Sequence, residues 1–387
     1  MEPRGGRQLD ELVISMKRNI KVGVVAAALL FAAFFAYNGW TAKAQTQTPP
    51  QGPTIGQQFK NIKVLNDVPA DQLGKIMNLF SASLGVDCSF CHNTKDYSSD
   101  EKREKLTARK MISMTFEINK ANFGGRPQVS CNSCHNGHQE PNASPNLWPV
   151  AETPEPKQPD TKPTADQILA NFVTAMGGPD KIAKVTSRHI TATRLEPDGK
   201  TEPEDIWQQG KSIRISTTYA QPAANGALAK DIIITTGYNG TNGWRVSSTG
   251  QPIRLSPDDL AQLKLAAQML FTPDLKSIYT KFDYRFTDEI DGKPVYIVTA
   301  TSPSGQVERL GFDVATGLLV RRSYVVRTAL GPFVYQSDYS DYKDFGGVKI
   351  PTTIKVAQPG VRFTRQVTKV KINAPVTDAS VFDEPKK

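Results

Sequence analysis

Cys88-Ser89-Phe90-Cys91-His92 and Cys131-Asn132-Ser133-Cys134-His135 are two copies of one pattern, C-x-x-C-H, and they use all four cysteines of the 387-residue chain. This pattern is the attachment motif of c-type haem. The two thiols add to the two vinyl groups of one haem. The next residue, a histidine, then lies under the iron as its proximal ligand, because its turn is tethered to the porphyrin edge. The sequence therefore predicts two covalently bound haem c groups, with His92 and His135 on the irons.

Two other uses of paired cysteines fit this sequence less well. Zinc ribbons hold their C-x-x-C pairs about 15–20 residues apart, and the gap between Cys91 and Cys131 is roughly twice that. A thioredoxin-type dithiol does not require a histidine after the second cysteine of each pair.

The N-terminus predicts export from the cytoplasm. Lys17, Arg18 and Lys21 precede an apolar run over residues 22–35, and Ala42-Lys43-Ala44 then forms an A-x-A cleavage site. We interpret residues 1–44 as a secretory signal peptide. The alternative is an uncleaved membrane anchor, because the 19 residues 22–40 approach the ~20 that span a bilayer. Either interpretation places the rest of the chain in the periplasm or another extracytoplasmic space, soluble or membrane-anchored.

The formal net charge of +9 is spread along the chain. Beyond the N-terminus no dense block of lysine and arginine occurs, so we expect a solvated basic surface and no nucleic-acid partner.

Composition divides the mature chain into two domains. A polar linker over residues 45–56 precedes a dihaem cytochrome c domain at 57–138. A second linker, 139–164, contains seven prolines and few apolar residues, which is typical of an extended, semi-rigid connection. A β-rich domain at 165–387 follows and contains no cysteine.

The dihaem domain is expected to be small and all-α. Leu73, Ile76 and Phe80 recur at helical spacing before Gly85, a natural helix stop. A second helix is expected from about residue 99 to 119, broken by Gly124. The order helix, turn, C-x-x-C-H thus occurs twice.

The sixth position of each iron can be open, which suits oxygen or peroxide chemistry, or filled, which suits electron transfer. A methionine sulfur in that position raises the reduction potential relative to a second histidine. The domain contains Met77, Met111 and Met114, and each helix before a haem motif carries at least one of them. Methionine on an apolar stripe can also simply fill core. His138 is a spare ligand for the other iron, or an exposed residue.

Three stretches resemble the cytochrome c subunit of photosynthetic reaction centres: NIKVLNDVPADQLGKIMNLFSASLGVDCSFCH, EKREKLTARKMISMTFEINK and VSCNSCHNG, within residues 61–137. That family carries four haems, and three of its irons take a methionine from the helix before the motif. The resemblance implies Met77 as sixth ligand to the haem on Cys88 and Cys91. It implies Met111, with Met114 as fallback, for the haem on Cys131 and Cys134. With two haems, the chain need not serve a reaction centre.

The segment after residue 164 predicts a short amphipathic helix at 164–176 and then many strands with alternating apolar residues. Asn239-Gly240 and Asp291-Gly292 are hairpin-turn signals, and a helix is expected at about 256–270. We therefore predict an α+β domain with an antiparallel, curved sheet or half-open barrel. We interpret His189 as an ordinary strand residue.

The stretches ADQILANFVTAMGG and YNGTNGW, with the run of hairpins, resemble the LolA-like outer-membrane lipoprotein-sorting fold. This resemblance implies a half-open barrel around an apolar cavity that binds a lipid, a quinone or a protein tail. The alternative role is a scaffold that positions the haem domain.

The sequence thus favours an exported dihaem c-type cytochrome that passes electrons between periplasmic or membrane-bound redox partners, without a catalytic residue of its own. One alternative is a dihaem peroxidase-type enzyme, which requires a five-coordinate haem and a distal acid or base. Another is a lipid- or quinone-binding module that uses its haems as a redox switch.

Overall fold

The computed structural model describes residues 52–141, 162–220, 231–250, 253, 255–268 and 274–385. The predicted signal peptide or anchor and most of both predicted linkers lie outside the described residues. Within the described ranges, none of the helices has the length and apolarity required to span a membrane.

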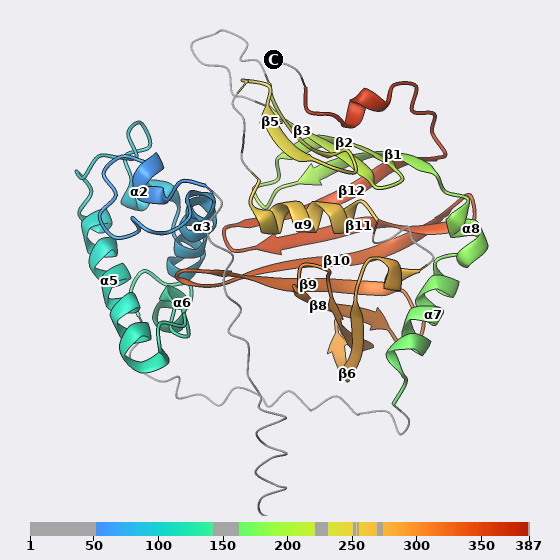
Figure 1. Ribbon diagram of the computed structural model, residues 1–387, viewed down its shortest axis with the longest axis horizontal. Coiled ribbons are helices and arrows are strands. Elements are labelled where there is room, and N and C mark those ends of the chain that lie inside the picture. Colours follow the sequence, from blue (N-terminus) through green and yellow to red (C-terminus); the bar gives the residue numbers. More distant parts are fainter. Residues whose placement is uncertain are drawn as a thin grey trace, which may run out of the picture. The chain divides into compact units, whose positions relative to one another are not determined.

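The first described part, residues 52–138, is helical and is called the helical segment below (Figure 1). Its elements are α2 (Ile55–Gln58), η1 (Ala70–Gln72), α3 (Leu73–Leu84), α4 (Cys88–Cys91), α5 (Arg103–Phe123) and α6 (Cys131–His135). Each C-x-x-C pair lies in a short helical turn after a longer helix, as the sequence predicts.

Glycines end both long helices. Gly85 has a φ of 67° and donates its N–H to the carbonyl of Ser81, and Gly124 closes α5 with a φ of 60°. The helix predicted to begin near residue 99 begins instead at Arg103, because Asp100 lies ahead of it and binds the side chain of Arg109 at 2.9 and 3.0 Å.

Residues 162–385, called the sheet segment below, form one open antiparallel sheet of 12 strands in the order β5-β4-β3-β2-β1-β12-β11-β10-β9-β8-β7-β6 (Figure 1). Their bounds are β1 (Ser187–Leu195), β2 (Thr201–Gln209), β3 (Ser212–Tyr219), β4 (Ile232–Tyr238), β5 (Gly243–Ser247), β6 (Lys281–Ile290), β7 (Lys293–Thr301), β8 (Val307–Asp313), β9 (Leu319–Thr328), β10 (Gly331–Phe345), β11 (Val348–Gln358) and β12 (Val361–Ile372). Among the described strands, β5 and β6 each pair on one side only, so the sheet is a half-open barrel at most, which confirms the predicted fold class.

Hairpin turns were predicted more accurately than polar strands. Asp291 and Gly292 have φ values of 51° and 75° and join β6 to β7, as expected for such a pair.

The sequence pattern did not predict the strands β2, β5 and β8. In β2 and β8 the buried face carries carboxylates, Glu204 and Glu308, so the usual apolar alternation is missing. Arg365 of β12 pairs with Glu204, and Arg322 of β9, the next strand along the chain, pairs with Glu308.

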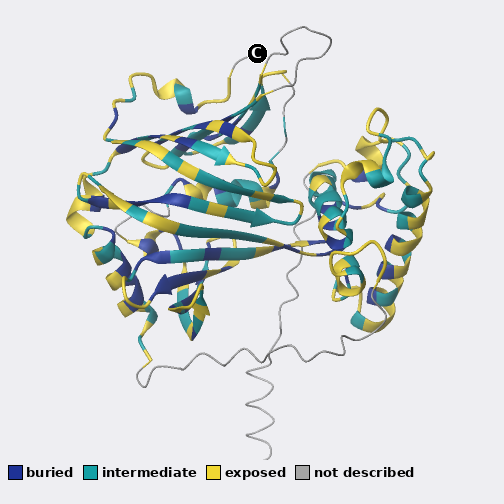
Figure 2. Cartoon of the chain, turned by 180° about the vertical axis from the view of Figure 1, so that it is seen from behind, coloured by how far each residue is buried: buried dark blue, intermediate teal, exposed yellow. Residues whose placement is uncertain are grey.

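Three helices accompany the sheet: α7 (Ala165–Ala175), α8 (Pro179–Ala183) and α9 (Pro257–Ala266); two short turns, η2 (Leu275–Ser277) and η3 (Ala379–Phe382), complete the segment. Thr164 caps α7 with a capping box to Gln167. Apolar side chains of α7 pack on β7, β8 and β9, with Phe172 edge-on to Phe312 at 5.4 Å. Figure 2 shows buried and exposed residues alternating along the strands.

A second buried cluster combines the two segments. Ile76 and Leu79 of α3 and Ile112 of α5 share it with Leu330 and Phe333 from the β9–β10 hairpin. Leu330 is fully buried and Phe333 is 1% exposed. The core of the helical segment is thus completed by residues more than 200 positions away in the sequence.

Candidate functional site

The first candidate site is built on α4. Asp87 caps this turn by accepting hydrogen bonds from the backbone N–H of Ser89 at 2.8 Å and from its hydroxyl at 2.6 Å. The side-chain hydrogen bond, followed by the backbone one, lowers the pKa of Asp87. The turn leaves the thiol of Cys88 exposed and that of Cys91 half-buried, and burial raises the pKa of Cys91.

His92 follows this turn with one ring nitrogen already engaged. Its Nδ1 lies 3.3 Å from the carbonyl oxygen of Tyr97, and burial lowers the pKa of the ring. In its neutral form the imidazole donates from Nδ1 to this carbonyl and keeps Nε2 as the free lone pair. Metal-binding histidines usually have this arrangement, in which an outer partner fixes the tautomer.

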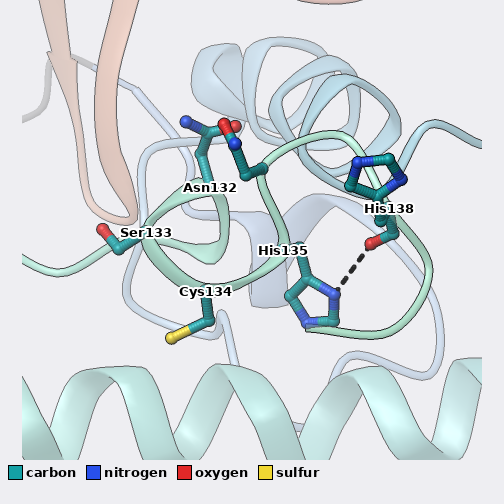
Figure 3. A pocket seen from close by; sticks show the side chains of 6 residues that line it. Asn132, Ser133, Cys134, His135 and His138 are labelled. Carbon is teal, nitrogen blue, oxygen red and sulfur yellow. Dashed lines mark hydrogen bonds between the residues drawn. The ribbon is translucent and has the colours of Figure 1, made fainter. Parts of the chain in front are cut away.

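The second candidate site repeats the arrangement on α6. Ser130 and Ser133 form a capping box at the start of the turn. His135 Nδ1 lies 3.0 Å from the carbonyl oxygen of His138. Figure 3 shows the side chains of Cys134 and His135 on the same side of the turn, beside a hollow lined by residues 132–136 and by His138.

His138 takes part through its backbone. The sequence left it as a spare iron ligand or an exposed residue, and its side chain is exposed. The carbonyls of Tyr97 and His138 were not anticipated as partners of the two histidines. Every residue has a carbonyl group, so only the backbone geometry identifies these two.

The three methionines predicted as distal ligands differ in burial. Met77 on α3 is half-buried and packs against the cluster around Ile76. Met111 and Met114 on α5 are 38% and 42% exposed, and Leu106 on the same helix is 42% exposed. Large apolar side chains exposed on α5, the helix that packs against α4, are what a covering porphyrin would bury, so the residues present fit a haem.

The helices pack in crosswise pairs. α3 packs directly against α6, and α5 against α4, whereas α3 with α4 and α5 with α6 make no comparable contact. Each helix that carries a candidate methionine is therefore not packed closely against the histidine turn that follows it. Among the described residues, no three His, Cys, Asp or Glu side chains gather into a cluster that could hold a bare metal ion.

Known structures resemble the sheet segment in fold. A LolA superfamily protein from Nitrosomonas europaea is 15% identical, with 58% of this chain and 99% of that chain covered and a TM-score of 0.36. An outer membrane lipoprotein-sorting protein domain from Vibrio parahaemolyticus is 11% identical, with 57% and 94% covered and a TM-score of 0.37.

Two curated relatives match the chain in sequence. Cytochrome c-554 of Chloroflexus aurantiacus is 27% identical over a 205-residue alignment that covers 40% of this chain and 48% of that protein. The photosynthetic reaction center cytochrome c subunit of Rubrivivax gelatinosus is 24% identical over a 229-residue alignment that covers 53% of this chain and 57% of that protein. The chain thus spans about half the length of these relatives.

Residues 30–232 match the family described as photosynthetic reaction centre cytochrome C subunit. The match extends well beyond the stretch 61–137 on which the resemblance was first seen. The two C-x-x-C-H turns lie inside it, which is consistent with covalent haem c. The chain belongs to the photosynthetic reaction centre cytochrome c subunit family.

Proposed function

We propose that this protein is an exported dihaem c-type cytochrome that transfers electrons between redox partners. One observation carries the proposal: both C-x-x-C-H turns present a histidine whose Nδ1 is engaged by a backbone carbonyl, so that Nε2 is free for iron. Cys88 and Cys91 anchor the first haem, and Cys131 and Cys134 the second. His92 and His135 are the proximal ligands.

Methionines fill the sixth positions in this proposal. Met77 serves the first haem and Met111 the second, with Met114 as the fallback. The packing of the helices supports this pairing. Each methionine-bearing helix, α3 or α5, is not packed closely against the turn that follows it in sequence, α4 or α6. A haem between two axial ligands requires such a separation.

The chain's own residues have two tasks in the transfer. The carbonyls of Tyr97 and His138 hold the imidazoles in one orientation in both oxidation states. Leu106 and the methionines exclude water from the porphyrin face, which limits solvent reorganisation. The bound haem supplies one-electron chemistry, at a potential that a methionine ligand raises relative to a second histidine.

The relatives point to the kind of partner. They are described as a cytochrome c-554 and as reaction center cytochrome c subunits, so we propose a periplasmic or membrane-bound redox protein as donor or acceptor. The predicted export signal agrees with that location. This chain carries two haem motifs, whereas the reaction-centre subunits that it resembles carry four haems. The proposal therefore does not include a photosynthetic reaction centre as the partner.

Two variants test the site. His135→Ala is expected to lose the normal low-spin spectrum of the second haem. His138→Ala is the matched control, because it retains the backbone carbonyl that binds His135 and should leave that spectrum unchanged. Intact-protein mass spectrometry should show two added haems. A colourless protein with the mass of the bare polypeptide would refute the proposal, and rapid peroxide turnover would favour the peroxidase alternative.

A second candidate function is ligand binding in the sheet segment. A hollow of about 340 Å³ lies among residues that include Val185, Arg188, Gln208 and Ala267. Gln208 is 6% exposed, and its side-chain oxygen accepts no hydrogen bond from the part of the chain that the structure describes. The volume is near the lower end for small-molecule sites, so it fits a polar head group better than a whole lipid. Mass spectrometry of lipid or quinone extracted from the purified protein tests this function.

A further inference from the structure

One face of α3 is held by the sheet segment at three places. The first is an ion pair. The ammonium of Lys75 lies 3.0 Å from a carboxylate oxygen of Asp259 and 3.0 Å from the hydroxyl of Ser256, both at the start of α9. The side chain of Lys75 is only 11% exposed, so this contact excludes most of the surrounding water.

The second place is the β9–β10 turn. Leu330 packs in one buried cluster with Ile76 and Leu79 of α3. The N–H of Ala329 donates to the side-chain oxygen of Gln72 at 3.3 Å, just before α3 begins. At Gly331 a Cβ atom would lie 2.8 Å from the Cβ of Ser130, so the turn approaches the second haem motif closely.

The third place is the β11–β12 turn. A Cβ atom added to Gly360 would lie 3.1 Å from the Cβ of Asn78, so this backbone also rests on α3. Each of these three contacts comes from an element that lies at least 170 residues further along the chain.

The three contacts centre on the side of α3 away from Met77, which packs against the buried cluster only as a partly buried neighbour. Successive residues of an α-helix are about 100° apart, so Met77 points about 160° away from both Lys75 and Leu79. We infer that the sheet segment positions α3 and thereby holds Met77 against the first haem, with Lys75 as the positioning residue. This inference rests on the proposed function, in which Met77 is the sixth ligand of that haem.

The helix α9 continues the contact into the sheet. Asp259 meets Lys75 at one end of α9, and Gln262, one turn later, donates to the buried carboxylate of Glu308 at 3.0 Å. Because Glu308 is fully buried and also bound by Arg322, this end of α9 is fixed to the interior of the sheet. α3 is therefore attached to a rigid support, not to a surface loop.

The test uses the full holoprotein and the sulfur-to-iron charge-transfer absorption that marks methionine ligation. Lys75→Met and Asp259→Asn remove the ion pair from either side. We expect each to weaken this absorption and to tighten the binding of added imidazole, which displaces methionine, at the first haem by about fivefold. The exchanged pair Lys75→Glu with Asp259→Lys should recover part of the loss. Lys63→Met, at an exposed lysine before α3, is the control.

Met77→Ala separates the inference from the proposal on which it rests. If Met77→Ala abolishes the absorption of one haem while Lys75→Met and Asp259→Asn behave like Lys63→Met, the positioning role is wrong and the ligand assignment stands. If Met77→Ala changes neither the absorption nor imidazole binding, Met77 is not the ligand and the positioning role fails with it. The inference is supported if Lys75→Met and Asp259→Asn both weaken the absorption and tighten imidazole binding at the same haem that Met77→Ala affects, and leave the other haem unchanged.

Discussion

Arg322→Met should be among the most destabilising single substitutions in the sheet segment. Arg322 donates to both carboxylate oxygens of Glu308, from Nε at 2.7 Å and from a terminal nitrogen at 2.9 Å. Glu308 is fully buried, and its remaining partners are the hydroxyl of Tyr279 at 2.9 Å and the amide of Gln262 at 3.0 Å. The negative charge of Glu308 raises the pKa of Arg322 against the opposing effect of burial, so the two residues form an ion pair.

The magnitude follows from what the substitution leaves behind. Methionine fills much of the volume of the arginine but leaves a buried carboxylate with two neutral hydrogen bonds. Breaking one side of such a buried pair costs about 3–5 kcal/mol. Replacing both partners by apolar residues of similar size is often neutral, so Arg322→Met combined with Glu308→Met should recover most of the stability. The neighbouring Arg321 pairs with Asp338 at 2.6 Å but is 31% exposed, and Arg321→Met should cost at most about 1 kcal/mol.

The assay is urea unfolding followed by tryptophan fluorescence, since Trp207 and Trp244 lie in β2 and β5. Wild type is expected to be the most stable, followed by Arg321→Met. The double variant Arg322→Met with Glu308→Met should be nearly as stable as Arg321→Met, and Arg322→Met alone should be much less stable. The reasoning fails if Arg322→Met costs no more than Arg321→Met, or if the double variant is as unstable as Arg322→Met alone.

Three further predictions concern the helical segment. Leu330→Ala should lower the free energy of unfolding by about 2–5 kcal/mol, because this side chain is fully buried in the cluster that the two segments share. Urea unfolding measures the loss. A loss below about 1 kcal/mol would show that the shared cluster does not hold the two segments together. Asp100→Asn should destabilise the protein at neutral pH. Hydrogen bonds from Arg109, then from Asn61, lower the pKa of Asp100, so its contribution is present above the unfolded value of about 4 and is lost as the pH falls through the folded value. The difference in melting temperature between wild type and this variant should therefore shrink as the pH is lowered below about 4, and a constant difference would contradict the assignment. Met111→Ala should lower the potential of the second haem in a redox titration, whereas Met114→Ala should not; the opposite result would make Met114 the ligand.

Local sequence was sufficient for the haem motifs, the helix ends and the hairpins. The spacing within C-x-x-C-H places two thiols and a histidine on one short turn whatever surrounds it. Gly85 and Gly124 end their helices because both adopt positive φ, and Asp291-Gly292 forms its hairpin for the same reason. Each of these features depends on residues a few positions apart, so a single sequence contains the information.

The strands β2 and β8 could not be identified in this way. Their buried positions carry Glu202, Glu204 and Glu308, which in isolation indicate a solvated segment. Glu204 is buried because Arg365 pairs with it, and Glu308 because Arg322 does. A buried charge is usually paired, but the sequence of one strand does not show its partner: Arg365 lies in β12, far along the chain from Glu204, and Arg322 lies in β9, the strand after Glu308.

The sequence by itself determined that this chain carries two C-x-x-C-H turns, a helix before each, and an open antiparallel sheet after them. The local backbone path decided which carbonyls orient His92 and His135, and only the tertiary structure decided that α3 rests on the sheet segment. The physical reason is the range of the interactions. Covalent attachment and helix capping act within a few residues, whereas the burial of Leu330 and the ion pair of Lys75 with Asp259 exist only after distant parts of the chain have folded together.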